Sequence, residues 1–475
     1  MAKKQTGGPG DAARVREAHG QAELDGLISR GVIIPAPDKV FIARDVPLEA
    51  IAAGAVIHPF SRISGEHTRI DQGAQVGPGG PAAVNNSWLG QGVLAGTLGP
   101  VSIIECAVGP GTVLGSGVAE QSVFLGREGD EPSFTTGYGF RVRKGTLYEE
   151  GACSAQHTDT KMTVLFPWVT LGSNVNWCDV LMTGGTGPGM GEFSEVGSGT
   201  IHFNFTARGD KATGSLLGSV CSGVFLREER LFIGGNNSII GPLNAEFGAV
   251  TPAGSRHSGR LQSGINIPAI WSPPSSASYS IPHSPHGSER RVGFEAEVYG
   301  SVRRVFQSQV MYIAELAAMA AWYAGTRMHI AQGDEDRTRL YSRAQEIVRM
   351  NIDERIAQLK GLAEKMERSS GLLEKKQPGD PRILQQRALL KNWPRVEKYL
   401  REHVFLPFPP PSDLLAALDA QKDKHGTQAP YTTLVQGLGS STVRTGKAWL
   451  RGVTETVAAT EALDAVPTLS NVTLS

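Results

Sequence analysis

An aliphatic residue recurs at every sixth position in several stretches of the chain between residues 31 and 259. The residues that keep this step are Ile51, Ile57 and Ile63, then Ile70, Val76 and Ala82 after a slip of one residue, and later Val108, Leu114, Ile233, Ile239 and Ala245. Short equal periods predict stacked coils, because one coil is too small to bury its own apolar side and is stable only against its neighbours. A coil with three flat sides needs one inward aliphatic residue for each side, which a step of six supplies.

The composition fits a folded, turn-rich chain. Tight turns favour glycine, and the chain holds 58 glycines in 475 residues. The 46 acidic and 46 basic residues leave no net charge, so neither nucleic acid nor a membrane surface is expected as a partner. No apolar run reaches the ~18 residues of a membrane span, and the start lacks a signal-like stretch, so we expect a cytoplasmic protein. The cysteines lack metal-site spacing, and no metal is expected: they are Cys106, Cys153, Cys178 and Cys221.

The periodicity changes beyond this region. A stretch rich in Ser and Pro predicts a linker, and after it apolar residues recur at steps of three and four, which is typical of amphipathic helices. One long helix is predicted over 335–376, with the apolar spacing of a seam that packs along a partner. A further helix over 382–403 is expected to break near Pro394. The predicted parts are an N-terminal segment 1–30, the coils 31–259, a linker 260–292, a helical domain 293–425 and a C-terminal tail 426–475 with a candidate helix.

One strand of the coiled region sorts its side chains by chemistry. In the run from Glu195 to Lys211, alternate residues point to opposite sides of an extended strand. The polar set is Thr200, His202 and Asn204, and the apolar set is Ile201, Phe203 and Phe205. We expect the apolar set to be buried and the polar set to be displayed together, which makes this strand the first place to look for function.

Three stretches carry a resemblance to a known family. They read GVIIPAPDKVFI from Gly31, GSGTIHFNF from Gly197, and FIGGNNSIIGPL from Phe232, with Ala253-Gly-Ser beyond it. Residues 31–259 resemble the left-handed parallel β-helix of the hexapeptide-repeat transferases, most closely the acetyltransferase half of the bifunctional N-acetylglucosamine-1-phosphate uridyltransferase/glucosamine-1-phosphate acetyltransferases. The resemblance implies a mainly β fold, in which a left-handed parallel β-helix is followed by an α-helical C-terminal domain.

The resemblance also implies roles for particular residues. The family's sugar-phosphate arginine falls on Arg143, beside Arg141, and a guanidinium fork suits phosphate. Asn204 matches the asparagine of the acetyl-donor site, and Lys211 matches the substrate lysine. Small residues that line the coenzyme A groove of the family fall on Gly235 and Ala253. The implied cofactor is acetyl-CoA or another acyl-CoA.

The chain departs from the family at the catalytic centre. The family's catalytic base is a histidine, and Asp179 takes its place here, while His202 is a second candidate base. Other family positions carry different residues, namely Met182 for a tyrosine, Glu195 for an asparagine, and Phe166 and Pro167 for a pair of lysines. We expect the nucleotidyltransferase half to be absent, because only about 30 residues precede Gly31 and they lack its glycine-rich loop.

Two hypotheses of function follow. In the first, a homotrimeric transferase acts on a sugar phosphate or nucleotide sugar: Arg143 and Lys211 hold the phosphate, Asn204 orients the acyl donor, and His202 or Asp179 takes the proton. In the second, a non-catalytic β-helix binds a nucleotide sugar or a protein, and the helical domain is its assembly module.

Overall fold

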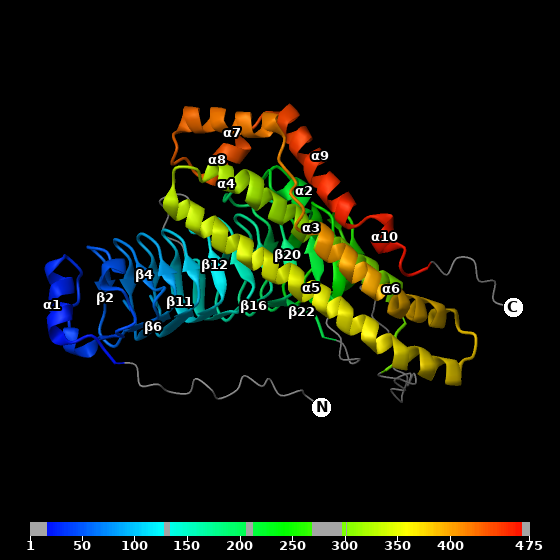
Figure 1. Cartoon of the computed structure of the whole chain (residues 1–475), viewed down its shortest axis with the longest axis horizontal. Coiled ribbons are helices and arrows are strands. Elements are labelled where there is room, and N and C mark those ends of the chain that lie inside the picture. The colour runs from blue at the N-terminus through cyan, green and yellow to red at the C-terminus, as the bar shows by residue number, and fades with distance from the viewer. Residues whose placement is uncertain (1–16, 128–133, 206–211, 268–296, 301, 468–475) are drawn as a thin grey trace, which may run out of the picture.

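The computed structural model describes residues 17–127, 134–205, 212–267, 297–300 and 302–467. It contains a parallel β-helix of about 11 turns followed by a helical region, as predicted. The long stack of coils and the helices that lie along one side of it are seen in Figure 1. Helices hold 38% of the residues and strands 24%, since each coil contributes only short strands.

The β-helix has three faces, each a ladder of parallel strands. The first face stacks β2 (Val56–Ile57), β5 (Gln75–Val76), β8 (Leu94–Ala95), the starts of β11 (Val113–Glu120) and β13 (Thr136–Val142), β15 (Cys153–Ser154), β18 (Thr170–Leu171), β21 (Glu195–Val196), β24 (Phe232–Ile233), β26 (Ala249–Thr251) and β28 (Gly264–Ile265). The second face stacks β1 (Phe41–Ile42), β3 (Arg62–Ser64), β6 (Ala82–Asn85), β9 (Val101–Ile104), the ends of β11 and β13, β16 (Asp159–Lys161), β19 (Asn176–Cys178), β22 (Ile201–Phe203) and the starts of β25 (Ser238–Ala245) and β27 (Arg256–Leu261).

The third face is the one that the helical region covers. It stacks β4 (Arg69–Ile70), β7 (Trp88–Leu89), β10 (Ala107–Val108), β12 (Ser122–Phe124), β14 (Thr146–Tyr148), β17 (Val164–Leu165), β20 (Val180–Met182), β23 (Ser215–Leu217) and the ends of β25 and β27. Every residue of the six-residue step named above is buried in the interior of the coils. Each buried Val, Leu or Ile among them contributes roughly 1.5–3 kcal/mol by leaving water, which stabilises the stack.

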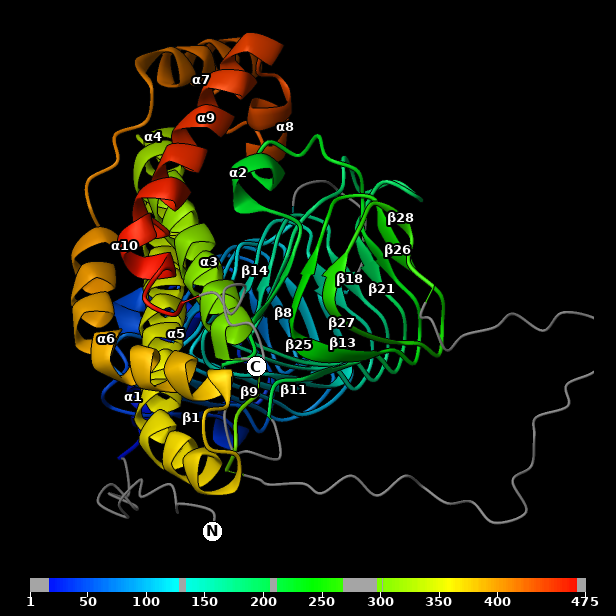
Figure 2. The same ribbon diagram turned by 90° about the vertical axis from the view of Figure 1, so that its right-hand side faces the viewer.

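Ten α-helices flank or cap the β-helix in the described part of the chain. They are α1 (Gln21–Ser29), α2 (Val220–Gly223), α3 (Val302–Ala321), α4 (Met328–Ile330), α5 (Glu335–Lys376), α6 (Pro381–His403), α7 (Ser412–His425), α8 (Tyr431–Gln436), α9 (Ser440–Val457) and α10 (Thr460–Leu463), with a π-helical turn at Trp322–Arg327 and 3₁₀ turns at Pro37–Lys39 and Leu48–Ala50. Contacts of α5 with β10, β12 and β14 place it along the third face. Figure 2 shows α3, α5, α6 and α9 gathered on this one side of the coils, whereas α1 lies at the N-terminal end of the stack in Figure 1.

The long helix α5 spans the range that its apolar spacing predicts. Its seam residues are buried, and they are Ile352, Ile356, Leu359, Ala363 and Met366. Helix α5 contacts α6 and α3 as well as the coils, so its buried seam lies within the packed helical region. Helix α6 does not break at Pro394, contrary to expectation. Pro394 lacks the N–H that would bond the carbonyl of Leu390, and both residues lie on the exposed side of the helix.

Candidate functional site

The strand that carries the candidate residues is turned the opposite way from prediction. His202 is 3% exposed and Thr200 is fully buried, whereas Ile201, Phe203 and Phe205 are between 39% and 61% exposed. The pairing of β19 and β25 with β22 puts His202 in the interior ladder with Trp177 and Ile239. A shift of one residue would reverse every side chain of a strand, so the register of the whole stack overrides the polarity of this segment.

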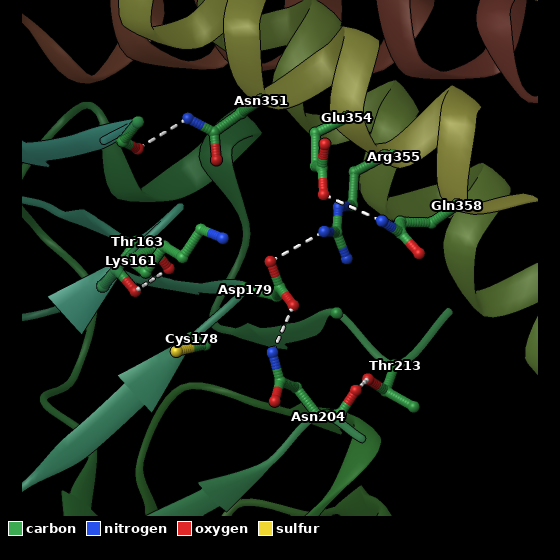
Figure 3. A network of polar contacts seen from close by, with 12 residues as sticks. Lys161, Thr163, Cys178, Asp179, Asn204, Thr213, Asn351, Glu354, Arg355 and Gln358 are labelled. Atoms are coloured by element: carbon green, nitrogen blue, oxygen red, sulfur yellow. Dashed lines mark hydrogen bonds and ion pairs between the residues drawn. The ribbon is translucent and has the colours of Figure 1, made fainter. Parts of the chain in front are cut away.

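Asp179 and Asn204 meet at the corner between the second and third faces. Asp179 follows β19 and Asn204 follows β22, so stacking brings them side by side, and Asn204 Nδ2 donates to Asp179 Oδ2 at 2.7 Å. Arg355, from α5, donates through Nη2 to the other carboxylate oxygen, Oδ1, at 2.7 Å. We call these three residues the Asp179 cluster; Figure 3 shows them pointing toward one another. The side chains of Asp179 and Arg355 are 5% and 1% exposed, so the carboxylate is sealed between coil and helix.

The backbone conformation of Asp179 belongs to the corner rather than to a special site. Its φ of 65° lies in the left-handed region, which residues other than glycine seldom adopt. Gln121 and Met162, which precede strands of the same third face in earlier coils, have φ values of 43° and 47°. The coil turns sharply at each of these positions, and the turn accounts for the positive φ.

Helix α3 closes the same corner from a second direction. Gln309 brackets the backbone of Gly214: its Oε1 accepts from the Gly214 N–H at 3.1 Å, and its Nε2 donates to the Gly214 carbonyl at 3.0 Å. One turn before Arg355 on α5, Asn351 donates to the carbonyl of Gly145 at 2.8 Å. The two helices therefore hold the corner through hydrogen bonds to the coil backbone as well as through the buried ion pair.

Both ring nitrogens of His202 are used inside the coil. Nδ1 lies 2.6 Å from the carbonyl oxygen of Cys178, and Nε2 lies 2.8 Å from Ser215 Oγ. A carbonyl can only accept, so Nδ1 carries the proton and Nε2 accepts from the Ser215 hydroxyl. Burial lowers the pKa of His202 to about 4, with Arg355 adding to the effect against the opposing charge of Asp179. His202 is thus a neutral, hydrogen-bonded core residue without access to solvent.

The burial of His202 predicts a loss of stability in acid. Its pKa falls from the usual 6.5 to about 4 on folding, so its contribution is present above pH 6.5 and is lost as the pH falls toward 4. At pH 5 the expected loss is about 2 kcal/mol. Urea unfolding at pH 7.5 and at pH 5 gives the change in the free energy of unfolding between the two pH values. We expect this change to be smaller for His202→Gln than for the wild type, because glutamine keeps polar atoms but does not titrate in this range. An equal effect in both proteins would contradict this assignment.

The two candidate arginines lie on the outer side of the second face. Arg143 donates through Nε to Asp159 Oδ1 at 2.7 Å and through Nη2 to Cys178 Sγ at 3.2 Å. Arg141 Nη1 lies 3.9 Å from Asp159 Oδ2, and its side chain is 64% exposed. Lys161 lies one coil further along, on the same outer side. Glu120, in register with Arg143 in the preceding coil, is a second carboxylate beside these residues. Three cations and two carboxylates leave this patch, which we call the second-face basic patch, with an excess of one positive charge.

The remaining candidates lie elsewhere. Lys211 is outside the described residues. Gly235 and Ala253 sit where the second-face strands begin, whereas Asn204 follows the end of such a strand. About six residues of extended chain separate these two ends, or roughly 20 Å. A Cβ on Gly235 would meet the Ser198 carbonyl oxygen at 3.1 Å, so close stacking of neighbouring coils already accounts for this glycine.

No motif in the sequence includes Arg355 or Gln309, so neither residue could be predicted directly. Arg355 does, however, lie one position before Ile356, and Asn351 one position before Ile352, on the buried side of α5. Two polar residues four positions apart beside an apolar seam indicate polar partners across the interface, and that is the pattern which could have identified them.

A second buried ion cluster joins the helices to the β-helix. Arg327, at the end of the π-helical turn, is fully buried and donates to Glu150 at 2.5 and 3.1 Å and to Glu149 at 3.0 Å. Tyr323 donates to Glu149 Oε1 at 2.5 Å, and the Arg327 guanidinium stacks 3.5 Å from the ring centre of Tyr431. Burial raises the pKa of Glu149 to about 7 despite the opposing charge of Arg327. We call these five residues the Arg327 cluster.

The described residues contain no group of three or more His, Cys, Asp or Glu side chains placed to hold a metal ion. No helix in the described ranges is both long and apolar enough to cross a bilayer.

The parallel β-helix of stacked coils fits the fold of the hexapeptide-repeat transferases. In a comparison with curated proteins it is 28% identical over 235 residues to the bifunctional protein GlmU of Fervidobacterium nodosum. The match covers 50% of this chain and 41% of that relative, so the chain spans less than half of the relative's length. No family model matches the chain.

Proposed function

We propose that this chain binds a sugar phosphate or nucleotide sugar on the second face of its β-helix, and that it does not transfer an acyl group through Asp179 or His202. The Asp179 cluster carries this proposal. A general base must reach the proton that it removes. The Asp179 carboxylate is occupied by Arg355 and Asn204, and His202 is enclosed in the coil, so neither is open to a substrate.

The second-face basic patch is the proposed binding surface. Arg141 is largely exposed, and Arg143 is held by Asp159 in a fixed orientation. The guanidinium fork of Arg141 suits two phosphate oxygens, and Arg143 adds a fixed positive charge beside it. Phe203 lies two coils beyond Lys161 on the same outer side, about 10 Å away at the usual strand spacing. Phosphates at the arginines and an aromatic base toward Phe203 match the two ends of a nucleotide sugar.

An acyl-CoA is the cofactor that the family resemblance implies, and the corner geometry fits it poorly. Gly235 and Ala253 would border it at the start of the second-face strands, while Asn204 already donates its amide to Asp179. The homotrimer remains part of the proposal. The exposed side chains of Ile201 and Phe205 would face a neighbouring copy of the chain, because contiguous apolar patches mark contact surfaces, and Phe203 between them would lie where that copy meets the base.

Calorimetry with UDP-N-acetylglucosamine tests the proposal. We expect the wild-type chain to bind it and the double variant Arg141→Gln/Arg143→Gln to bind at least tenfold more weakly, because each charge-assisted hydrogen bond contributes about 1.5–3 kcal/mol. Arg62→Gln removes an exposed arginine from the same face several coils away and is the matched control. Equal affinity of the double variant and the wild type would overturn the binding site.

The same protein, mixed with acetyl-CoA and glucosamine 1-phosphate, is expected to release no thiol. Thiol release that disappears in Asp179→Asn would instead establish acyl transfer and reject the non-catalytic assignment.

A further inference from the structure

A large cavity lies where the last coils of the β-helix meet the first turns of α3. Its volume is about 730 Å³. Helix α3 contacts β25 directly, and the two elements lie side by side in Figure 2. Three arginines and three carboxamides line the cavity, together with Ser308 and apolar side chains, and no acidic residue is among its lining residues. The arginines are Arg260, Arg303 and Arg304, and the carboxamides belong to Asn244, Gln307 and Gln385.

Among the residues that the structure describes, the positive charges of this cavity are not fully balanced. Arg260, on β27, pairs with Glu246. Arg303 and Arg304, on α3, form no ion pair with a carboxylate of the described residues. Two guanidinium groups therefore remain in excess where the two parts of the chain meet.

The position of Arg303 is fixed by its neighbour on the helix. With its amide oxygen turned toward Arg303, Gln307 accepts from Nε at 3.2 Å and from Nη2 at 3.0 Å. A held guanidinium binds phosphate with less loss of side-chain entropy than a free one. Met311 and Pro242 supply an apolar wall beside the charged groups, so the cavity offers contacts to an organic portion as well as to an anion.

We propose that this cavity binds a small molecule that carries a diphosphate or a phosphate ester. Guanidinium groups from α3 and β27 converge on it, and their planar forks match phosphate oxygens. The cavity is built from the third-face ends of β25 and β27 together with α3, so it is distinct from the second-face basic patch. A ligand there would contact both the β-helix and the helical region and would stabilise their contact by mass action.

Calorimetry with inorganic pyrophosphate at low ionic strength tests this site in the full chain. We expect the wild type to bind pyrophosphate and Arg303→Gln/Arg304→Gln to bind it at least 30-fold more weakly, because two charge-assisted contacts are lost. Arg395→Gln removes an exposed arginine of α6 outside the cavity and should bind as the wild type does. Circular dichroism confirms that each variant is folded. Absent binding by the wild type, or equal binding by the double variant, would overturn the proposal.

A second titration separates this site from the proposed function. Glucose 1-phosphate tests whether a phosphate ester is accepted, and tighter binding of it than of inorganic phosphate would support contacts to the organic portion. Arg141→Gln/Arg143→Gln should leave pyrophosphate binding in the cavity unchanged. The second-face affinity for UDP-N-acetylglucosamine, which that variant loses, should persist in Arg303→Gln/Arg304→Gln. If pyrophosphate binding followed the second-face arginines instead, the cavity would be rejected while the second-face patch stood.

Discussion

Arg327→Met is expected to destabilise the folded protein by about 3–5 kcal/mol, because removal of one partner of a buried ion pair leaves the other charge without compensation. The wild-type guanidinium is fully buried and pairs with Glu149 and Glu150 from the β-helix. Methionine keeps much of the length of the side chain. The decrease in the free energy of unfolding therefore reflects the lost charge and hydrogen bonds more than a change in side-chain volume. The stacking on Tyr431 is lost as well, which adds to the effect.

Urea unfolding followed by circular dichroism measures this effect. The control is Arg339→Met, which removes an arginine that also lies over an aromatic ring, Trp88, but is 40% exposed. The control should cost no more than about 1 kcal/mol, since water screens exposed charges. A loss of similar size in the two variants would show that the Arg327 cluster does not hold the helices to the β-helix.

Arg355→Leu is expected to cost a comparable 3–5 kcal/mol, because the buried carboxylate of Asp179 loses its only cationic contact among the described residues. Addition of Asp179→Asn should recover more than half of that loss. Asparagine removes the buried charge and keeps an oxygen that can accept from Asn204 Nδ2. The recovery is the decisive part of the experiment, because it distinguishes an uncompensated charge from a packing defect.

The free energy of unfolding of the wild type, both single variants and the double variant forms a double-mutant cycle. Arg349→Leu serves as the control, since Arg349 lies on α5 and is exposed. Additive losses in the cycle would mean that Asp179 and Arg355 do not interact, and the closed corner on which the non-catalytic assignment depends would then be withdrawn.

The architecture could be predicted because it depends on local periodicity. The step of six at residues such as Ile57, Ile63 and Val76 repeats in consecutive coils, and every one of these side chains is buried. The apolar seam of α5 could likewise be predicted from the sequence, because steps of three and four place Ile352, Ile356 and Leu359 on one side of a helix. Such patterns need no knowledge of distant contacts.

The candidate site was only partly predictable. The sequence identified Asp179 and Asn204, and stacking does bring them together at one corner. It could not supply Arg355, which lies 176 residues after Asp179 and has no motif around it. A helix that folds back along the β-helix decides which corner residues stay open to solvent, and its docking depends on contacts that no local pattern records.

For this protein, the sequence alone determined that the N-terminal half forms stacked coils and that long amphipathic helices follow. The tertiary structure decided which way the candidate strand faces and what its polar groups do. Alternation of side chains along the strand predicts only that Thr200 and His202 lie on the same side. Pairing of β22 with β19 and β25 determines that this side faces the interior of the coils. The physical reason is that strand register is fixed by neighbouring coils, because a shift of one residue in β22 alone would break its pairing on both sides.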